Sequence, residues 1–257
     1  MSTTGNTPLT ARSVLASVLL GTEPPWLPTR LLVRTAELFG IADGTARVAL
    51  SRMASAGEAV AEGGGYRLVG RLAERQARQQ VSRRGDVRPW DGGWELATVG
   101  GDGSRPASAR AALREACRQL RLAELREGVW ARPDNLDPAR SPDAAAVVAD
   151  WCQRWRGAQP DPRPDVVELF EVGDWVRVAE ELRTDMARLL GPLEAHDRGA
   201  LAEGFVTSAA VLRHLQADPL LPAELVPPDW PGAELRAEYD RYDAAYRAVL
   251  VDWFAEA

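Results

Sequence analysis

The segment from Gly40 to Val69 constrains the fold of this chain more than any other, because a helical pattern in it leads directly into strand-like patterns. Between Asp43 and Gly57, apolar side chains recur at the spacing of an α-helix, about 100° per residue, and fall on one face. Aspartate commonly caps helix N-termini, and glycine commonly follows a helix end. The pattern predicts a helix that begins near Asp43 and stops at Gly57. Its predicted buried residues are Ala46, Ala49, Leu50 and Met53.

The opposite face of this predicted helix carries small and hydrogen-bonding side chains around two arginines. The face comprises Gly44, Arg47, Val48, Ser51, Arg52 and Ser55. Arginine matches guanine edges and phosphate groups in geometry, and small neighbours let a helix approach a DNA groove closely. An arginine-bearing amphipathic helix is by itself more often a solvated surface. The patterns on either side of this helix are therefore needed to distinguish a DNA-binding helix from a solvated surface helix.

The neighbouring patterns favour a DNA-binding domain. Leu9–Leu20 and Pro28–Phe39 are two further helical patterns, and Gly40 supplies the tight turn that a helix-turn-helix requires. After Gly57, residues 59–61 and 66–69 have strand character and flank three glycines that tolerate positive φ in a hairpin loop. Three helices followed by a hairpin predict a winged helix-turn-helix domain over residues 1–70.

The distribution of charge agrees with a nucleic-acid partner at this end of the chain. Residues 1–90 contain 12 arginines and 7 acidic residues, a formal charge of +5, whereas residues 91–257 contain 19 arginines and 30 acidic residues, a charge of −11. Phosphate groups attract the first part and repel the second. The residues that we expect to contact DNA are Thr45, Arg47, Val48, Ser51, Arg52 and Arg67.

The middle of the chain predicts a second domain behind a linker. Residues 71–92 contain a polar helical stretch, Leu72–Arg84, and then a loop with glycines and a proline. In residues 93–173, strand and helix patterns alternate, which predicts a small ferredoxin-like α+β domain. The predicted strands are Trp94–Val99, Leu125–Ala131 and Val166–Val172, and the predicted helices are Ala107–Leu120 and Pro142–Trp155.

Residues 174–257 predict a helical C-terminal domain, which makes the expected fold class α+β and multidomain. The predicted helices are Trp175–Leu190, Arg198–Leu215 and Ala233–Phe254. The intervening run Asp218–Gly232 contains five prolines, which cannot continue a helix. We expect this run to form an ordered surface strap. Its predicted anchors are Leu220, Leu221, Leu225 and Trp230.

Composition limits the remaining classes of function. The chain has 257 residues, of which 46% are hydrophobic and 26% charged, and no run reaches the roughly 18 to 20 apolar residues of a membrane span. We expect a cytoplasmic protein that does not associate with membranes. The two cysteines, Cys117 and Cys152, lie in helical patterns without CxxC spacing, and the chain has only two histidines. We therefore expect neither a metal site nor a cofactor.

Nearly the whole chain resembles the PaaX-like family of bacterial transcriptional repressors, named for control of phenylacetate degradation. The resemblance lies in VALSRMASAG at Val48–Gly57 with Arg47 before it, in WELATVGG at Trp94–Gly101, and above all in DPLLPAELVPPDWPG at Asp218–Gly232. It implies a winged-helix domain, a ferredoxin-like central domain and a helical C-terminal domain. It also implies a homodimeric repressor that binds double-stranded operator DNA and is released by a small effector, an acyl-CoA or aryl-CoA thioester.

The resemblance assigns no effector-binding residues. Four tryptophans are candidate walls of an aromatic pocket, although packing in the core is the favoured interpretation of each. They are Trp130, Trp151, Trp155 and Trp175.

Two other classes of function stay open at this point. The first is a metal-dependent nuclease built on the ferredoxin-like domain. Asp102 lies beyond the first strand of that domain, but Thr98, Val99 and Gly100 occupy the strand end where a metal-binding carboxylate is expected. An isolated aspartate is more often a loop cap than a ligand. The second is an acyl-CoA-binding protein that does not bind DNA.

Overall fold

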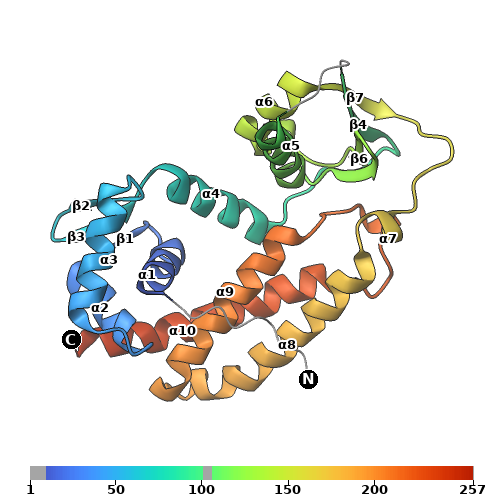
Figure 1. The fold of residues 1–257 in the computed structure, drawn as a ribbon. Coiled ribbons are helices and arrows are strands. Elements are labelled where there is room, and N and C mark those ends of the chain that lie inside the picture. The colour runs from blue at the N-terminus through green and yellow to red at the C-terminus, as the bar shows by residue number, and fades with distance from the viewer. Residues whose placement is uncertain (1–9, 101–105, 257) are drawn as a thin grey trace. The chain divides into compact units, whose positions relative to one another are not determined.

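The computed structural model describes residues 10–100 and 106–256 (Figure 1). The chain divides into two compact units, each built from separate stretches of sequence. One comprises Met1–Gln80, Leu182–Arg213 and Leu235–Ala257, and the other Val81–Glu181 and His214–Glu234. The description below calls them unit 1 and unit 2.

Unit 1 begins with three helices, as predicted: α1 (Ala11–Leu20), α2 (Thr29–Glu37) and α3 (Asp43–Ser55). The predicted first residue of α1, Leu9, lies outside the described residues. Between α2 and α3 the chain turns at Gly40, whose φ is 68°, a value that favours glycine. This turn sets the angle at which α3 leaves α2.

The predicted capping role of Asp43 is wrong. Ala42 occupies the capping position, and no side chain forms a capping hydrogen bond there. Asp43 lies one residue further on, in the first turn of α3, where its carboxylate accepts hydrogen bonds from Arg47 instead. The acidic side chain still suits the helix N-terminus, because the helix dipole favours negative charge at that end.

A small antiparallel sheet follows α3, with strand order β1-β3-β2. The hairpin of β2 (Ala59–Glu62) and β3 (Gly65–Leu68) confirms the predicted strands. Its two-residue loop, Gly63 and Gly64, has φ values of 56° and 76°, as tight hairpin turns of this length require. The third strand, β1 (Trp26–Pro28), was not predicted and pairs with β3 from a position just before α2.

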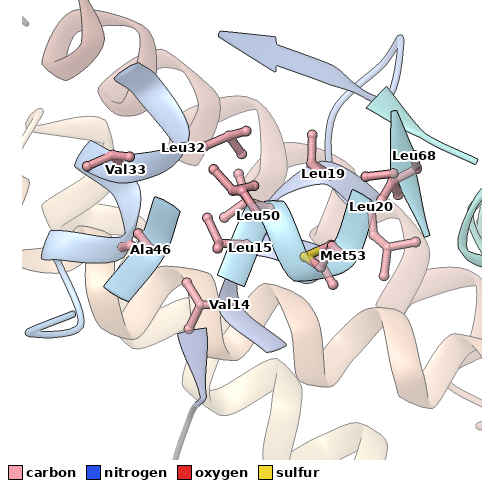
Figure 2. Close-up of a cluster of buried hydrophobic side chains, with 14 residues drawn as sticks. Val14, Leu15, Leu19, Leu20, Leu32, Val33, Ala46, Leu50, Met53 and Leu68 are labelled. Atoms are coloured by element: carbon pink, nitrogen blue, oxygen red, sulfur yellow. The ribbon is translucent and has the colours of Figure 1, made fainter. Parts of the chain in front are cut away.

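The core of this part of unit 1 lies where α1, α2 and α3 meet the sheet. Figure 2 shows side chains from all three helices and from β3 converging on one another. Leu15, Leu19, Leu32 and Leu50 are fully buried in this cluster. Burial of a leucine side chain contributes about 1.5 to 3 kcal/mol. The cluster therefore fixes the inner face of α3 and leaves its outer face to solvent.

Most of the rest of unit 1 comes from three long C-terminal helices: α8 (Val172–Glu194), α9 (Leu201–Ala217) and α10 (Gly232–Ala255). Unit 1 takes the part of α8 from Leu182 on, the part of α9 up to Arg213 and the part of α10 from Leu235 on. A short helical turn, η2 (Arg198–Ala200), precedes α9. The three helices confirm the predicted ones to within four residues at each end, and the predicted start of the second helix, Arg198, falls in η2. The helix α4 (Gly70–Arg84) follows the hairpin and corresponds to the predicted linker helix.

Unit 2 contains a four-stranded antiparallel sheet with the order β5-β6-β4-β7. Its elements are β4 (Trp94–Val99), α5 (Ala107–Gln119), β5 (Ala123–Arg126), β6 (Val129–Pro133), η1 (Pro138–Arg140), α6 (Pro142–Trp151) and β7 (Cys152–Ala158). The helices α5 and α6 pack together and share a buried cluster with strand residues that include Ala97 and Trp130. The α+β class is thereby confirmed.

Three predicted elements of unit 2 differ from the structure. The predicted strand Leu125–Ala131 is a hairpin, β5 and β6, that turns at Gly128 with φ of 75°. The predicted helix Pro142–Trp155 ends at Trp151, and β7 begins at the next residue. The predicted strand Val166–Val172 is wrong: α7 (Val166–Leu169) occupies its first part, and Val172 already belongs to α8.

The proline-rich run forms a strap anchored by leucines and Trp230, as predicted, but the predicted surface position is wrong for its first part, because residues 218–222 are buried. Leu220 and Leu221 are buried, and the Trp230 ring stacks on Trp175 at a centroid distance of 4.3 Å. Only a short helical turn, η3 (Ala223–Leu225), interrupts the strap. Arg132, 1% exposed, donates hydrogen bonds to the backbone oxygens of Pro219 and Leu220, at 3.4 and 3.2 Å.

Candidate nucleic-acid interface

The helix α3 presents two chemically different faces. Ala46, Leu50 and Met53 are buried, as the periodicity predicted, whereas Ala49, which was also predicted to be buried, is half-buried. The outer face is open to solvent within unit 1. Its exposed residues are Gly44, Thr45, Arg47, Val48, Ser51, Arg52 and Ser55. The face combines two cations, three hydroxyls and little bulk, which are properties that suit a major groove.

Arg47 is held by an ion pair within its own helix. Its Nε and Nη2 donate to the two carboxylate oxygens of Asp43, at 2.6 and 3.2 Å. The hydrogen bond with Asp43 and the attraction between the charges raise the pKa of Arg47. Both side chains are more than half exposed, so water screens the pair and it adds little to stability. Its main effect is to hold the guanidinium along the helix surface.

Arg52 differs from Arg47 because no side chain in the described part of the chain bonds to it or pairs with it. It lies one turn and a half beyond Arg47 on the same outer face, close to the C-terminal end of α3. A guanidinium without a carboxylate partner keeps all five donors available. Of the two arginines on this face, Arg52 is therefore the better placed to bind an incoming phosphate or guanine.

Arg67 extends from β3 of the hairpin and also has a carboxylate partner. Its Nε and Nη2 donate to Glu62 at the end of β2, at 2.5 and 3.0 Å. This hydrogen bond lowers the pKa of Glu62 and raises that of Arg67. The positive charge of Arg67 is thus offset by a neighbour at the hairpin loop. Sequence reasoning identified Arg67 but not Glu62.

The hairpin itself is fastened to the helices behind it. The indole of Trp26 donates to the backbone oxygen of Glu62 at 3.1 Å, and the Thr29 hydroxyl donates to the Gly64 oxygen at 3.0 Å. Trp26 lies in β1 and Thr29 begins α2, so the hairpin loop bonds to the segment that leads into the helix-turn-helix. This attachment fixes the hairpin relative to α2.

Comparisons with known proteins agree with this arrangement. The model of the PaaX-like protein family matches residues 10–76, and that of the PaaX-like protein C-terminal domain matches residues 174–255. The chain belongs to the PaaX-like family. This PaaX-like chain is also similar to the solved structure of an uncharacterized protein, Rv0674, from Mycobacterium tuberculosis, at 40% sequence identity and a TM-score of 0.72. The match covers 95% of this chain and 99% of that one.

Membership of this family limits the classes of function to be considered for this chain. PaaX-like proteins are transcriptional regulators and generally not enzymes. No curated protein matches the chain. Among the helices that the structure describes in this PaaX-like chain, none has both the length and the apolar composition of a membrane span.

The four candidate tryptophans of this PaaX-like chain differ in their burial. Trp130 and Trp175 are buried, each 6% exposed, which confirms core packing for these two. Trp151 and Trp155 are 36% and 45% exposed, so core packing does not describe them. Both lie at or after the end of α6, on or next to the edge strand β7.

The alternative of a metal-dependent nuclease gains no geometric support. Asp102 lies outside the described residues, and residues 10–100 and 106–256 contain no group of three or more His, Cys, Asp or Glu side chains that could hold a metal ion. Cys117 and Cys152 are both buried, and no disulfide joins them. Burial raises the pKa of Cys117 to about 12, with Cys152 adding to the effect, so this thiol stays protonated and unreactive.

Sequence reasoning missed the two carboxylates that pair with the predicted arginines. The first left a readable signal, because Asp43 and Arg47 are four residues apart and must face each other on a helix. The second did not, since Glu62 and Arg67 meet only once the hairpin closes. The candidate interface therefore carries more negative charge than its arginine content suggested.

Proposed function

We propose that this protein is a sequence-specific, DNA-binding transcriptional regulator whose outer face of α3 enters the major groove. The observation that carries the proposal is that Arg47, Ser51 and Arg52 are exposed on one helix face in a PaaX-like chain. Val48, 50% exposed, adds an apolar surface that suits a thymine methyl group. Thr45 at the start of α3 and Arg67 on the hairpin would contact the DNA backbone.

The element order supports a winged helix-turn-helix over residues 1–70 as the DNA-binding domain. Helix, strand, helix, turn, helix and hairpin follow one another in unit 1. Residues 71–92 then serve as a linker, and residues 93–173 as a ferredoxin-like domain. The order β4-α5-β5-β6-α6-β7 is the one that a ferredoxin-like domain has. Residues 174–257 complete the chain as a helical domain.

The mechanism that we favour is repression by a homodimer. Two copies of α3 would occupy half-sites about one helical turn of DNA, or a multiple of it, apart on a pseudo-palindromic operator of a catabolic operon. A small effector, such as an acyl-CoA or aryl-CoA thioester, would favour a dimer geometry with the wrong spacing. Such a coupling typically changes DNA affinity by about 1 to 3 kcal/mol.

The experiment that tests this function starts from genomic DNA of the source organism. Fragments that the purified protein retains are sequenced, and the dissociation constant for the best fragment is measured by gel shift at fixed salt. We expect a recurrent pseudo-palindromic sequence bound far more tightly than a scrambled fragment of the same length. Equal affinity for both fragments would contradict the proposal.

A second arm of this experiment addresses dimerisation and release. Sedimentation of the protein with the selected fragment gives the number of protomers per DNA duplex, for which we expect two. Adding a panel of coenzyme A thioesters should then release the DNA with one class of acyl group. If a thioester binds tightly and the protein retains no genomic fragment, the result would instead favour the interpretation as an acyl-CoA-binding protein.

A further inference from the structure

The position of α3 depends on the helices behind it. In the part of the chain that the structure describes, the side-chain hydrogen bonds of α3 all lie within the helix, from Arg47 to Asp43 and from Ser55 to Ser51. Its inner face packs into the cluster shared with α1 and α2. Whatever holds α1 and α2 therefore also holds the face proposed to bind DNA.

The helix α2 is bonded to the end of the C-terminal helix α10. Arg34 donates from Nη2 to the backbone oxygen of Trp253 at 3.1 Å, and its guanidinium carbon lies 4.5 Å from the centre of the Trp253 ring. Trp253 lies in the last turn of α10, where backbone oxygens have no partner within the helix. Arg34 thus satisfies one of these oxygens and makes a cation–π contact at the same time. In Figure 1, α10 is drawn in red and ends beside α2, at the point marked C.

Two further contacts join the helix-turn-helix to the C-terminal helices of unit 1. Arg247 of α10 donates to the backbone oxygen of Gly21, which follows α1, at 2.6 Å. The buried carboxylate of Asp243 orients Arg247 by accepting from its Nε at 2.9 Å. Just beyond the C-terminal end of α2, the rings of Phe39 and Phe205 lie 5.2 Å apart. Both helices behind α3 are therefore fastened to α9 or α10.

We infer that Arg34 and Trp253 are positioning residues for DNA binding and form a latch between α2 and α10. The inference rests on the proposed function. Only the short turn from Leu38 to Ala42 separates α2 from α3, so fixing α2 also fixes the angle of α3. With the latch broken, the face of α3 keeps its side chains but has to be ordered when DNA binds, and this ordering weakens affinity.

A different role for Arg34, direct contact with a DNA phosphate, predicts different behaviour. Loss of a phosphate contact lowers the slope of log Kd against log salt by about 0.9. Loss of a latch leaves that slope unchanged, because the contacts with DNA stay the same. Removal of the Trp253 ring should weaken binding only if the latch matters, since an indole at the end of α10 adds no charge.

The experiment measures Kd and its salt dependence for the full-length protein on the fragment selected with the unaltered chain. The variants are Arg34→Gln, Trp253→Ala and the double variant. Arg34→Gln removes both the hydrogen bond to the Trp253 backbone oxygen and the cation–π contact, so we expect it to bind about tenfold more weakly. Trp253→Ala removes only the cation–π contact and should weaken binding by a smaller factor. The double variant should bind about as weakly as Arg34→Gln, because the ring contact is already lost in that variant. The salt slope should not change. Trp253→Phe, which keeps a ring, should bind more tightly than Trp253→Ala.

Arg198→Gln is the matched control, because Arg198 pairs with Glu256 near the same end of α10 but not with α2. It should bind DNA as the unaltered protein does. Circular dichroism and thermal melting show whether each variant is folded at the assay temperature. If Trp253→Ala loses helix, Arg34→Gln and Trp253→Phe carry the comparison, since neither removes a ring from the end of α10.

Several outcomes would overturn the inference. Unchanged affinity in a folded Trp253→Ala variant would exclude the latch, and so would a reduced salt slope in Arg34→Gln alone. In both cases the unaltered protein still binds its fragment, so the proposed function survives. Failure of the unaltered protein to select any genomic fragment would instead refute the proposed function, and the latch with it.

Discussion

Glu62 and Arg67 face each other across the hairpin and share two hydrogen bonds, at 2.5 and 3.0 Å. Both are on the surface, with side chains 45% and 41% exposed. A phosphate that approaches Arg67 must therefore compete with a carboxylate already in place. The same holds for Arg47 and Asp43 on α3. These pairs offset the positive charge of the candidate interface, and we expect them to limit its binding to arbitrary DNA.

The first prediction concerns the carboxylate of the hairpin. Glu62→Gln frees Arg67 and removes a negative charge, so DNA affinity should rise by about threefold to tenfold, with a larger gain for a scrambled fragment than for the operator. Gel-shift titrations of both fragments at one salt concentration measure this. Glu181→Gln, at an exposed pair with Arg177 in unit 2, provides a control with the same change of charge. Weaker binding by Glu62→Gln would show that Glu62 itself assists recognition.

The second prediction separates the two arginines of α3. Arg52→Gln should weaken operator binding more than Arg47→Gln does, because Arg47 has to leave Asp43 before it binds DNA. We expect a loss of about 1 to 3 kcal/mol for Arg52 if it reads a base. Arg114→Gln, an exposed arginine of α5, is the control for charge alone. Unchanged affinity in a folded Arg52→Gln variant would remove this arginine from the interface.

The third prediction concerns the close approach of β1 to β3. A Cβ atom added at Gly65 would overlap the backbone carbonyl of Leu27 and lie 2.9 Å from the Trp26 ring. Gly65→Ala should therefore separate the two strands and destabilise the protein by about 2 kcal/mol. Thermal melting should show a loss of about 4 to 8 °C. The same substitution at Gly44, where no atom lies within 4 Å, should leave the melting temperature unchanged or higher.

The fourth prediction concerns the buried cation of unit 2. Burial lowers the pKa of Arg132 to about 9, while Glu95 opposes this effect. Arg132 donates at 2.7 Å to Asn135, whose amide also donates to the Leu220 oxygen at 3.0 Å. Arg132→Met removes the donor to the Asn135 side-chain oxygen and to the Pro219 backbone oxygen, and should cost about 3 kcal/mol.

Chymotrypsin digestion is the local readout for this variant, since the strap contains leucines and a tryptophan. Arg132→Met should be cut within residues 218–232 faster than the unaltered protein. Arg126→Met, an exposed arginine of β5, should be cut at the unaltered rate. Equal resistance of Arg132→Met would mean that the apolar contacts of Leu220 and Leu221 suffice to hold the strap.

The fifth prediction concerns pH. Burial lowers the pKa of His214 from its ordinary value of 6.5, although its hydrogen bond to the Trp175 oxygen and the charge of Asp218 oppose this shift. The unfolded chain therefore binds a proton at a pH where the folded chain does not. The stability contributed by neutral His214 is present above about pH 6.5 and is lost as the pH falls below it.

The measurement is the melting temperature of the protein between about pH 7.5 and 5.5. His214→Phe keeps a ring to stack on Trp175, where the centroids now lie 4.4 Å apart, but does not titrate. Its melting temperature should fall less over this range than that of the unaltered protein. Parallel curves would show that His214 does not contribute to the acid sensitivity.

Local chemistry explains which elements could be predicted from sequence. The hairpin of β2 and β3 was predictable because Gly63 and Gly64 supply the positive φ that its loop needs. By contrast, β1 has only three residues and ends at Pro28, so its pairing with β3 carries no periodic signal. The segment forms a strand only because the tertiary fold places it beside β3.

The errors in unit 2 have equally local causes. The passage from α6 to β7 occurs between Trp151 and Cys152 without a glycine or proline to mark it. The apolar residues after Asp165 suggested a strand, yet Asp165 caps a helix by accepting from the backbone nitrogens of Val167 and Glu168. An aspartate three residues before a glutamate is a capping signature, and it outweighs a short apolar run.

Unit 1 closes only when stretches near both ends of the sequence meet, since Arg34 and Gly21 bond to residues more than 200 positions later. During synthesis at about 5 to 20 residues per second, the N-terminal helices would wait roughly ten seconds or more for α10 to leave the ribosome. Their surfaces toward α9 and α10 stay uncovered for that time. During this interval chaperones can bind the uncovered surfaces of the nascent chain. A premature stop codon, even one late in the sequence, would remove the contacts that α10 makes with the N-terminal helices.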